Sequence, residues 1–524
     1  MFFTICLGLF IVFGACVLTV LRRKRQTLPL PPGPRPTPIF GNLKDLPTVD
    51  GQEWLHWLKH KELYGPISSL NVFGNNLIII NDAELAVRLL EKRSGIHSSR
   101  PRLVFAEMSG WHSILGALRD ATIVRKTRKL MHQEIGTKSS MARFNDVQAT
   151  EVSRFLMRVL DKPEELQRHI KTEAGSVILK IAYGYNVEPH DHDPLVDMAD
   201  KAMGDFSMAM QSTRAVEFLP FLQYLPSWFP GAGFVGIAKD YKATAEAFSG
   251  TPYAFVKRQM SIGQSRPSFL SNLLRNNPVE PGTKEENMIE WSAAALYGGG
   301  ADTTVSSLSS FFQAMALFPD TQRKAQQELD AVLGPNQIPK LQDRERLPYM
   351  DALIKEVFRW HPVVPVSLPH TSIEDDTFEG YFIPKGAAII ANIWAYTHDV
   401  DIYHDPMTFK PERFLATPDG HIPERDPRGL VFGFGRRICP GRLLADSNIF
   451  LTVAQALAVF DISKPIQDGV PQEIPIKFLP GVISHPAPFE LSIQPRSAAH
   501  RQLILSLEQL YPWEKSDAEH LASV

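Results

Sequence analysis

The only thiol outside the apolar N-terminal stretch lies in a loop too rich in glycine for regular structure. Cys439 stands in the run FGFGRRICPG from Phe432 to Gly441, whereas Cys6 and Cys16 both fall within the N-terminal stretch. The long globular part of the chain therefore cannot form an internal disulfide. Three glycines and a proline around Cys439 indicate a stiff, tight loop that holds the sulfur in one position. Arg437 supplies a nearby cation, which favours the thiolate.

A lone cysteine is usually a small buried apolar residue, but the pattern F-x-x-G-x-R-x-C-x-G is specific. It closely resembles the haem-thiolate loop of the cytochrome P450 monooxygenases. The resemblance implies a haem b cofactor with Cys439 as the axial iron ligand. It also implies that Phe432, Arg437 and Gly441 contact this cofactor.

Composition narrows the class of protein further. The 524 residues have a formal net charge of −2, which gives no reason to expect a nucleic-acid partner. The scarcity of cysteine is typical of a reducing, cytosol-facing compartment. A hydrophobic content of 44% is ample for a large core.

Residues 1–21 predict a transmembrane signal anchor. Phe2 to Leu21 carry no charge, and as a helix they would span about 30 Å, the thickness of one bilayer core. The basic cluster Arg22 to Arg25 follows at once, which predicts a lumenal N-terminus and a cytosolic catalytic domain. A cleaved signal peptide would carry its basic residues before the apolar run instead. The P450 resemblance implies single-pass insertion in the endoplasmic reticulum membrane.

The rest of the chain divides into a hinge, one large domain and a tail. Residues 22–39 are basic and proline-rich, so they predict an extended, semi-rigid hinge. Residues 40–495 show no composition shift and predict one domain, mainly α with small peripheral β-sheets (α+β). A helix is expected from Trp54 to Tyr64, a hairpin turning at residues 74–76, and a helix cap beginning at Asn81. Residues 496–524 form a charged tail whose apolar patch suggests a docking helix.

A long apolar helical stretch is interrupted by GGGADTT at residues 298–304. Glycine inside a helix costs about 1 kcal/mol relative to alanine, so these residues should have a function. They can admit a flat ligand, or open the helix beside a threonine hydroxyl. Taken alone, the run also fits a simple kink with a surface aspartate. It matches the oxygen-activating helix of the P450 family, which implies that Thr303 relays protons and that Asp302 supplies them.

Three further charged residues resemble the structural signature of the family. Glu356 and Arg359 lie one helical turn apart, which in isolation is most often a solvated pair. Together with Arg413 in PERF they resemble the E-x-x-R and arginine set of the family. The resemblance implies a buried, structural cluster beneath the haem loop, which loses several kcal/mol when one partner is removed.

Haem propionates require cations, and the resemblance suggests Arg437, His370 and Arg128 for this role. Relatives usually have tryptophan four residues before the position of Arg128, but this chain has Val124 there. The indole hydrogen bond to a propionate is therefore missing. The basic run at residues 125–129 is either a solvated helix face or a surface that docks an acidic reductase.

The family resemblance also locates the substrate-facing segments, at residues 294–303, 363–368 and 478–484. Here they are mainly apolar, and their apolar members are Ala295, Val363, Val364, Leu368, Leu479 and Val482. We expect a hydrophobic pocket, although each residue alone is also consistent with ordinary core.

These features predict a haem-thiolate monooxygenase that inserts one atom of O2 into an apolar small molecule. A fungal secondary-metabolite intermediate such as a terpenoid, polyketide or indole is expected, with NADPH electrons supplied by an NADPH-cytochrome reductase. A haem-thiolate isomerase or dehydratase, or a non-catalytic haem-binding relative, is the alternative. The Asp302–Thr303 pair argues against the isomerase, and only the altered Val124 region points to the non-catalytic protein.

Overall fold

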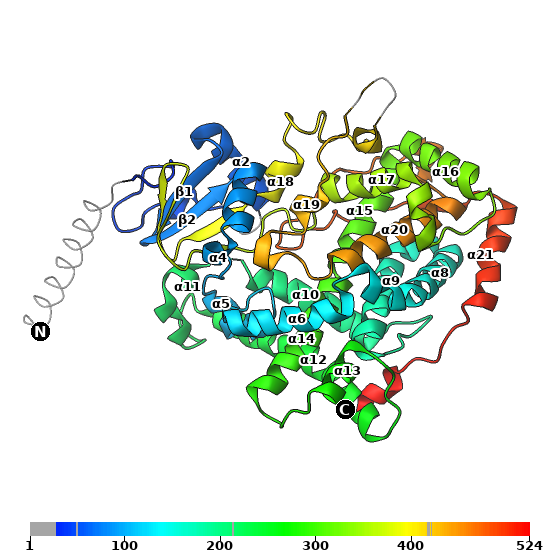
Figure 1. Ribbon diagram of the computed structural model, residues 1–524, viewed down its shortest axis with the longest axis horizontal. Helices are drawn as coiled ribbons and strands as arrows, with labels where there is room; N and C mark the ends of the chain where they lie inside the picture. The colour runs from blue at the N-terminus through cyan, green and yellow to red at the C-terminus, as the bar shows by residue number, and fades with distance from the viewer. Residues whose placement is uncertain (1–27, 49–50, 212–213, 417–419, 421, 524) are drawn as a thin grey trace, which may run out of the picture.

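The computed structural model describes residues 28–48, 51–211, 214–416, 420 and 422–523 (Figure 1). The predicted anchor, residues 1–21, and the basic start of the predicted hinge lie outside them. Within this described part, one helix, Arg442–Val459, is long and apolar enough to cross a membrane. Because 72% of that helix is buried inside the protein, it is a core helix of the fold.

The largest sheet has four strands in the order β1-β2-β6-β3 and lies beside α2 (Glu53–Tyr64) at one end of the molecule (Figure 1). The hairpin of β1 (Ile67–Val72) and β2 (Asn75–Ile80) is antiparallel, and β2 runs parallel to β6 (Ala388–Ala391). The edge strand is β3 (His370–Thr371). The hairpin turns at Phe73 and Gly74, both with positive φ, one residue earlier than predicted.

Three two-stranded sheets complete the β structure of the described chain. They pair β4 (Asp376–Phe378) with β5 (Tyr381–Ile383), β7 (Phe460–Ser463) with β10 (Ser492–Pro495), and β8 (Ile466–Gln467) with β9 (Val470–Pro471). The predicted cap at Asn81 is wrong. Asp82 caps α3 (Ala83–Ala86) by accepting a hydrogen bond from Leu85 N, because the Asn81 side chain is buried against Trp57 and Asn392.

Helices make up most of the molecule, which confirms the predicted mainly α fold with small peripheral sheets. The main ones are α6 (Ala121–Ile135), α8 (Asn145–Asp161), α9 (Leu166–Tyr183), α10 (Pro194–Ala209), α12 (Gly233–Ser261), α14 (Lys284–Ala301), α15 (Thr303–Leu317), α16 (Pro319–Leu333), α17 (Pro348–Trp360) and α20 (Arg442–Val459). Shorter ones include α4 (Ser94–His97), α5 (Val104–Met108), α11 (Ala215–Phe218), α13 (Phe269–Asn276), α18 (Ile393–Thr397) and α19 (Arg428–Val431).

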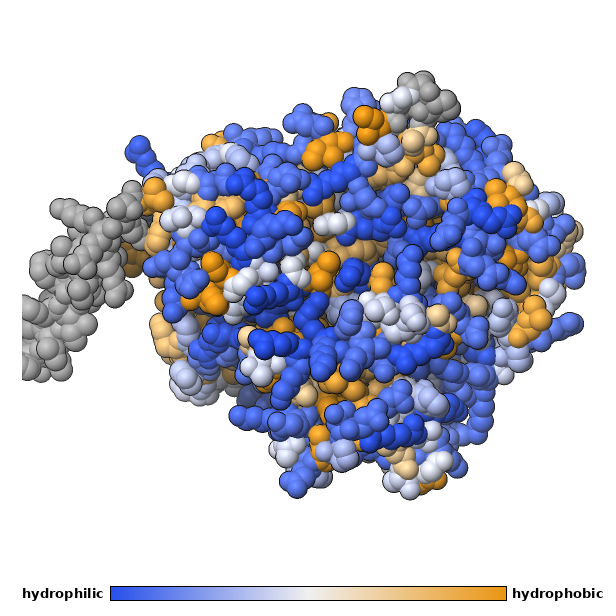
Figure 2. All heavy atoms as spheres, viewed as in Figure 1, coloured by the Kyte–Doolittle hydropathy of each residue, from blue (hydrophilic) through white to orange (hydrophobic). Residues whose placement is uncertain are grey.

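The hydrophobic core divides into two clusters where α14 ends and α15 begins. The apolar residues of α14 pack in one cluster with α9, α10 and α12, whereas those of α15 pack in a second with α8, α17 and α20. Nearly every α15 side chain is buried, and several of its polar side chains find partners in the core, as Ser309 Oγ does by donating to Gln167 Oε1 at 2.9 Å. The face shown in Figure 2 is mostly hydrophilic, with apolar side chains scattered over it.

The C-terminal tail is docked along the helical side of the molecule (Figure 1). Its helix α21 (Ala498–Leu510) buries Ile504 and Leu507 and packs against α8. Beyond it, Trp513 stacks on the Arg158 guanidinium, and Asp517 accepts a hydrogen bond from the backbone N–H of Asn186. The tail helix, suggested by an apolar patch alone, thus has a defined partner.

Candidate active site around Cys439

A cavity of about 360 Å³ lies between the α14–α15 junction, the start of α20 and the Cys439 loop. Its wall is mainly apolar. The apolar side chains come from seven separate stretches of the chain and include Ile114, Leu115, Ile178, Met203, Phe206, Ala295, Leu296, Val363, Val364, Leu368, Ile393, Val482 and Ile483. Cys439, Phe432 and Gly441 form part of the same wall.

The backbone of the cysteine loop is held in one conformation. Cys439 N donates a 2.7 Å hydrogen bond to Phe432 O, which closes the loop. Gly433 and Gly435 have φ values of 79° and 52°, a region that side chains rarely adopt. A Cβ at Gly435 would also lie 2.6 Å from the carbonyl oxygen of Leu90. The predicted stiffness of this loop therefore has a steric cause.

The cations beside the Cys439 sulfur differ from the prediction. Burial raises the pKa of the thiol, and the Gly441 N–H, Arg128 and Arg442 act in the opposite direction. Arg437, predicted to favour the thiolate, is turned away from the Cys439 sulfur. It donates to the carbonyl oxygens of Ser98 and Leu118, at 2.7 and 2.8 Å. Backbone acceptors across the loop hold its guanidinium, so adjacency in sequence did not bring it to the sulfur.

Three arginines face the cavity without an acidic partner among the described residues. They are Arg100, Arg128 and Arg437. Burial, followed by the neighbouring Arg437, lowers the pKa of Arg100 to about 9. Burial and Arg128 lower the pKa of Arg437 to about 10. Buried like charges are costly unless an anion compensates them, so this set fits a dianionic group such as the two propionates of haem.

His370 fits that role less well than the arginines. Its side chain lines the cavity and is buried, and burial together with Arg100 holds its pKa far below the usual value. Because a carbonyl oxygen only accepts, the 2.8 Å contact to His97 O requires the hydrogen on Nδ1. The neutral ring then has no second N–H to donate to a carboxylate. Arg100, which the sequence analysis did not single out, is a buried cation on the same cavity wall.

Val124 is buried on α6, so the valine that replaces the family's tryptophan is part of the core packing. Arg128 is on the same helix and lines the cavity, and no hydrogen bond connects it to other described residues. The structure therefore brings the predicted Arg128 to the cavity without a supporting indole.

The helix break expected near residues 298–304 is present. Asp302 separates α14 from α15, and Thr303 Oγ1 donates a 2.6 Å hydrogen bond to Gly299 O. Gly299 and Thr303 line the cavity, and a Cβ on Gly299 would meet no other atom. A Cβ on Gly300 would lie 2.7 Å from Ile178, so this glycine serves helix packing. Asp302 turns to the other side and pairs with His485 at 3.1 Å.

Glu356, Arg359 and Arg413 form one buried cluster. Arg359 donates from Nε and Nη2 to the two Glu356 carboxylate oxygens, at 2.7 and 2.8 Å, and Arg413 Nε donates to the same carboxylate at 3.2 Å. All three side chains are almost fully buried. Arg413 continues to Glu424 at 2.7 Å. Such a fully paired set is far from the solvated pair that the i,i+3 spacing alone suggests.

Five of the six predicted substrate-facing residues line the cavity, and Leu479 does not. Leu479 lies in the loop before His485 and its side chain is partly exposed. Met203 and Phe206 of α10 were missed, although the apolar face of that helix is visible in the sequence. A single chain gives no sign of which core helix also borders a cavity.

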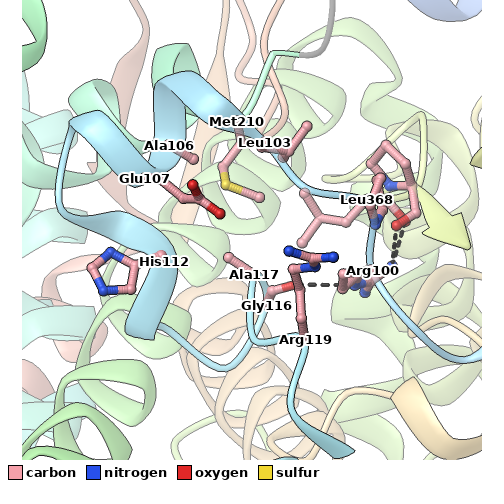
Figure 3. A pocket seen from close by; sticks show the side chains of 12 residues that line it. Arg100, Leu103, Ala106, Glu107, His112, Gly116, Ala117, Arg119, Met210 and Leu368 are labelled. Atoms are coloured by element: carbon pink, nitrogen blue, oxygen red, sulfur yellow. Dashed lines mark hydrogen bonds between the residues drawn. The ribbon is translucent and has the colours of Figure 1, made fainter. Parts of the chain in front are cut away.

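A second cavity of about 170 Å³ adjoins the first (Figure 3). Arg100, Gly116 and Leu368 border both cavities. In Figure 3, dashed lines show Arg100 bound across the wall, by Nε to Gly116 O at 3.0 Å and by Nη1 to Leu368 O at 2.6 Å. Arg100 is thus fixed at the boundary between the two spaces.

Comparisons with known proteins agree with this geometry. A sequence model of the cytochrome P450 family matches residues 31–493. The cytochrome P450 monooxygenase ppsD of Aspergillus oryzae is 48% identical over 514 residues, covering 98% of this chain and 97% of the relative. The O-methylsterigmatocystin oxidoreductase of Aspergillus flavus is 45% identical, covering 99% and 97%. The multifunctional cytochrome P450 monooxygenase af510 of Aspergillus fumigatus is 40% identical, covering 95% and 94%.

The family match spans the cavity, the cysteine loop and the helix break, and the relatives are aligned over almost their full length. Enzymes of this family use a haem iron with a thiolate ligand, O2, a small-molecule substrate and a redox partner. The chain therefore belongs to the cytochrome P450 family and is a haem-dependent monooxygenase.

Proposed function

We propose that the protein inserts one oxygen atom from O2 into an apolar small molecule bound in the 360 Å³ cavity. The observation that carries the proposal is the cavity itself, which has Cys439 on one wall, the Thr303 break on another and apolar side chains between them. Cys439 would hold the haem iron, and Arg100, Arg128 and Arg437 would hold its propionates.

Haem bound through a thiolate supplies the oxygen-activating chemistry, since electron donation from the sulfur favours cleavage of the O–O bond. The apolar side chains exclude water and orient a substrate without strong anchoring groups. Thr303 holds a hydroxyl proton at the cavity edge, and Asp302 replaces it from outside the cavity. Gly299, with no side chain, leaves the space beside the threonine open.

Electrons would come from NADPH through an NADPH-cytochrome reductase. The support is a group of exposed basic side chains on α6 and in the Cys439 loop, namely Arg125, Lys126, Lys129 and Arg436. Within the described chain no ion pair engages any of them. Free cations of this kind steer an acidic partner and speed its association.

We propose further that residues 1–21 anchor the protein in the endoplasmic reticulum membrane, with the catalytic domain in the cytosol. Exposed apolar residues support this orientation. Ile39 of the hinge is 84% exposed, and Trp228 in the loop after α11 is 79% exposed. Ring contacts of Phe73 with Phe40 and Phe218 connect these two regions. A shared apolar side suits the surface of a bilayer.

The substrate class is proposed as an apolar secondary-metabolite intermediate, such as a terpenoid, polyketide or indole. The relatives named above are monooxygenases or an oxidoreductase, which supports oxidation over isomerisation. The test is to co-express the protein with a fungal reductase and to incubate membranes with such compounds under ¹⁸O2. One ¹⁸O atom per product, dependent on NADPH, is expected. Product formed without label or NADPH would indicate the isomerase or dehydratase. The absence of any product would favour the non-catalytic haem-binding protein.

A further inference from the structure

Asp302 is paired on the side of the helix break that faces away from the cavity. His485 Nε2 lies 3.1 Å from Asp302 Oδ1, and 31% of the His485 side chain is exposed, against 14% for Asp302. Neither residue is part of the cavity wall, whereas the next residue, Thr303, is. The order from solvent to cavity is therefore histidine, carboxylate, hydroxyl.

The loop that carries His485 does not depend on this contact for its position. Ser484 N donates to Val363 O at 2.8 Å, and Ser306 Oγ of α15 donates to Ser484 O at 2.5 Å. Leu479 N donates to His485 O at 2.7 Å, which closes the loop on itself. These backbone bonds fix the loop against α15, so the His485 ring is available for a role other than holding it.

No other titratable side chain competes with Asp302 for the His485 ring in the described chain. His361 interacts electrostatically with His485, but it is buried and its Nε2 contacts Ser484 Oγ at 3.0 Å. Its pKa is held well below the usual value by burial, with a smaller contribution from His485, so it remains neutral. The His485 ring, which is more exposed than the Asp302 carboxylate, thus offers a titratable group between solvent and Asp302.

We propose that His485 is a positioning residue for proton delivery, which takes protons from solvent and passes them to Asp302. This rests on the proposed monooxygenase function. The ring gains a proton from water at Nδ1 and gives one from Nε2 to the carboxylate, and only N–H and O–H bonds are exchanged. Asp302 then turns to the Thr303 side of the break and gives this proton to Thr303 Oγ1, as the hydroxyl passes its own proton into the cavity. Exchange with water returns the ring hydrogen of His485 from Nδ1 to Nε2, so the net change is one proton moved from solvent to the cavity.

The stoichiometry of oxygen consumption tests this inference without knowledge of the substrate. One NADPH, one O2 and one proton give hydrogen peroxide and NADP⁺, whereas two NADPH, one O2 and two protons give two waters and two NADP⁺. A failing proton supply favours peroxide. The experiment uses full-length protein with reductase in membranes, and measures NADPH, O2 and peroxide for wild type, His485→Gln and Asp302→Asn. Haem content and the carbon monoxide spectrum are recorded for each.

Glutamine keeps a donor for Asp302 but cannot titrate. His485→Gln should retain haem and the carbon monoxide spectrum, while the NADPH consumed per O2 falls toward one. Water formation should slow by about tenfold, less than the roughly 10²-fold contribution of a positioned acid, because water still reaches Asp302. His404→Gln is the matched control, since His404 pairs with Asp405 at the exposed surface. Its stoichiometry should equal that of wild type.

Two results would overturn the inference. If His485→Gln consumes NADPH and O2 in the wild-type ratio, His485 does not deliver protons, and a lowered melting temperature alone would then show a structural role. If Asp302→Asn also keeps the wild-type ratio, the carboxylate itself is no relay. Failure of the proposed function looks different, because the wild type would then lack the thiolate carbon monoxide spectrum.

Discussion

Arg100, Arg128 and Arg437 come from three separate segments and meet at one cavity wall. The sequence indicated two of them through family resemblance, but not Arg100, because a lone arginine in a loop has no distinguishing pattern. The histidine expected to join them, His370, has its one N–H engaged by His97 O. Backbone carbonyl oxygens decide which side-chain N–H groups remain free to bind a propionate. The positions of these oxygens cannot be read from the sequence.

Arg128→Ala should weaken haem retention strongly, because Val124 offers no supporting hydrogen bond. A hydrogen bond to a charged group contributes about 1.5–3 kcal/mol, which is roughly 10- to 150-fold in affinity. Transfer of haem to apomyoglobin measures the loss. Lys126→Ala, on the exposed face of the same helix, is the control and should match wild type.

Equal transfer rates for wild type and Arg128→Ala would show that α6 does not hold a propionate. Val124→Trp extends the test. It should slow haem loss if the indole N–H reaches the carboxylate, although overpacking at this buried position costs about 1–3 kcal/mol.

Ionisation of the buried Glu173 carboxyl should lower the free energy of unfolding as the pH rises. Burial raises the pKa of its carboxyl from 4.5 to about 7, although Asn448 Nδ2 donates to it at 2.9 Å. Since the folded-state pKa is higher than the unfolded one, the favourable contribution is complete below about pH 4.5 and is lost as the pH rises through about 7. The loss is at most about 3 kcal/mol.

The measurement is the free energy of unfolding between pH 5 and 8 for wild type and Glu173→Gln. The variant should show a flatter decline, with the remaining slope due in part to Glu217, whose pKa burial also raises to about 7. Glu285→Gln, an exposed control, should follow the wild-type curve. A Glu173→Gln curve parallel to wild type would contradict the assignment.

At the scale of elements, the break between α14 and α15 was predictable from its glycines and threonines. The partner of Asp302 was not, because His485 lies far along the chain in a loop with no distinguishing pattern. The Glu356 cluster shows the same limit. Helical spacing predicts the contact with Arg359, but burial and the approach of Arg413 depend on how α17 packs.

Arg359→Leu should destabilise the protein by about 3–5 kcal/mol, because it leaves the buried Glu356 carboxylate short of its main partner. Chemical unfolding of the holoprotein measures the change. Arg323→Leu is a matched control, since Asp320 and Arg323 have the same order and spacing but are exposed. It should change stability by at most about 1 kcal/mol. Similar effects of the two substitutions would show that burial of the Glu356 cluster adds nothing.

At the scale of the whole molecule, the mainly helical fold follows from helix-length apolar patterns and from the family motifs. The docking of the tail does not, because Trp513 and Asp517 meet partners on α8 and beyond α9 that only the folded chain assembles. The same assembly brings the cysteine loop, the helix break and three arginines around one cavity. The proposed monooxygenase function depends on these groups meeting at one cavity.

The most direct test of this account is the absorption spectrum of the reduced, carbon monoxide-bound protein, for wild type and Cys439→Ser. Thiolate ligation gives the long-wavelength band for which the family is named. Wild type should show this band, and Cys439→Ser should lose it together with NADPH-dependent oxidation. If Cys439→Ser kept both, Cys439 would not be the iron ligand and the cavity would not be the active site.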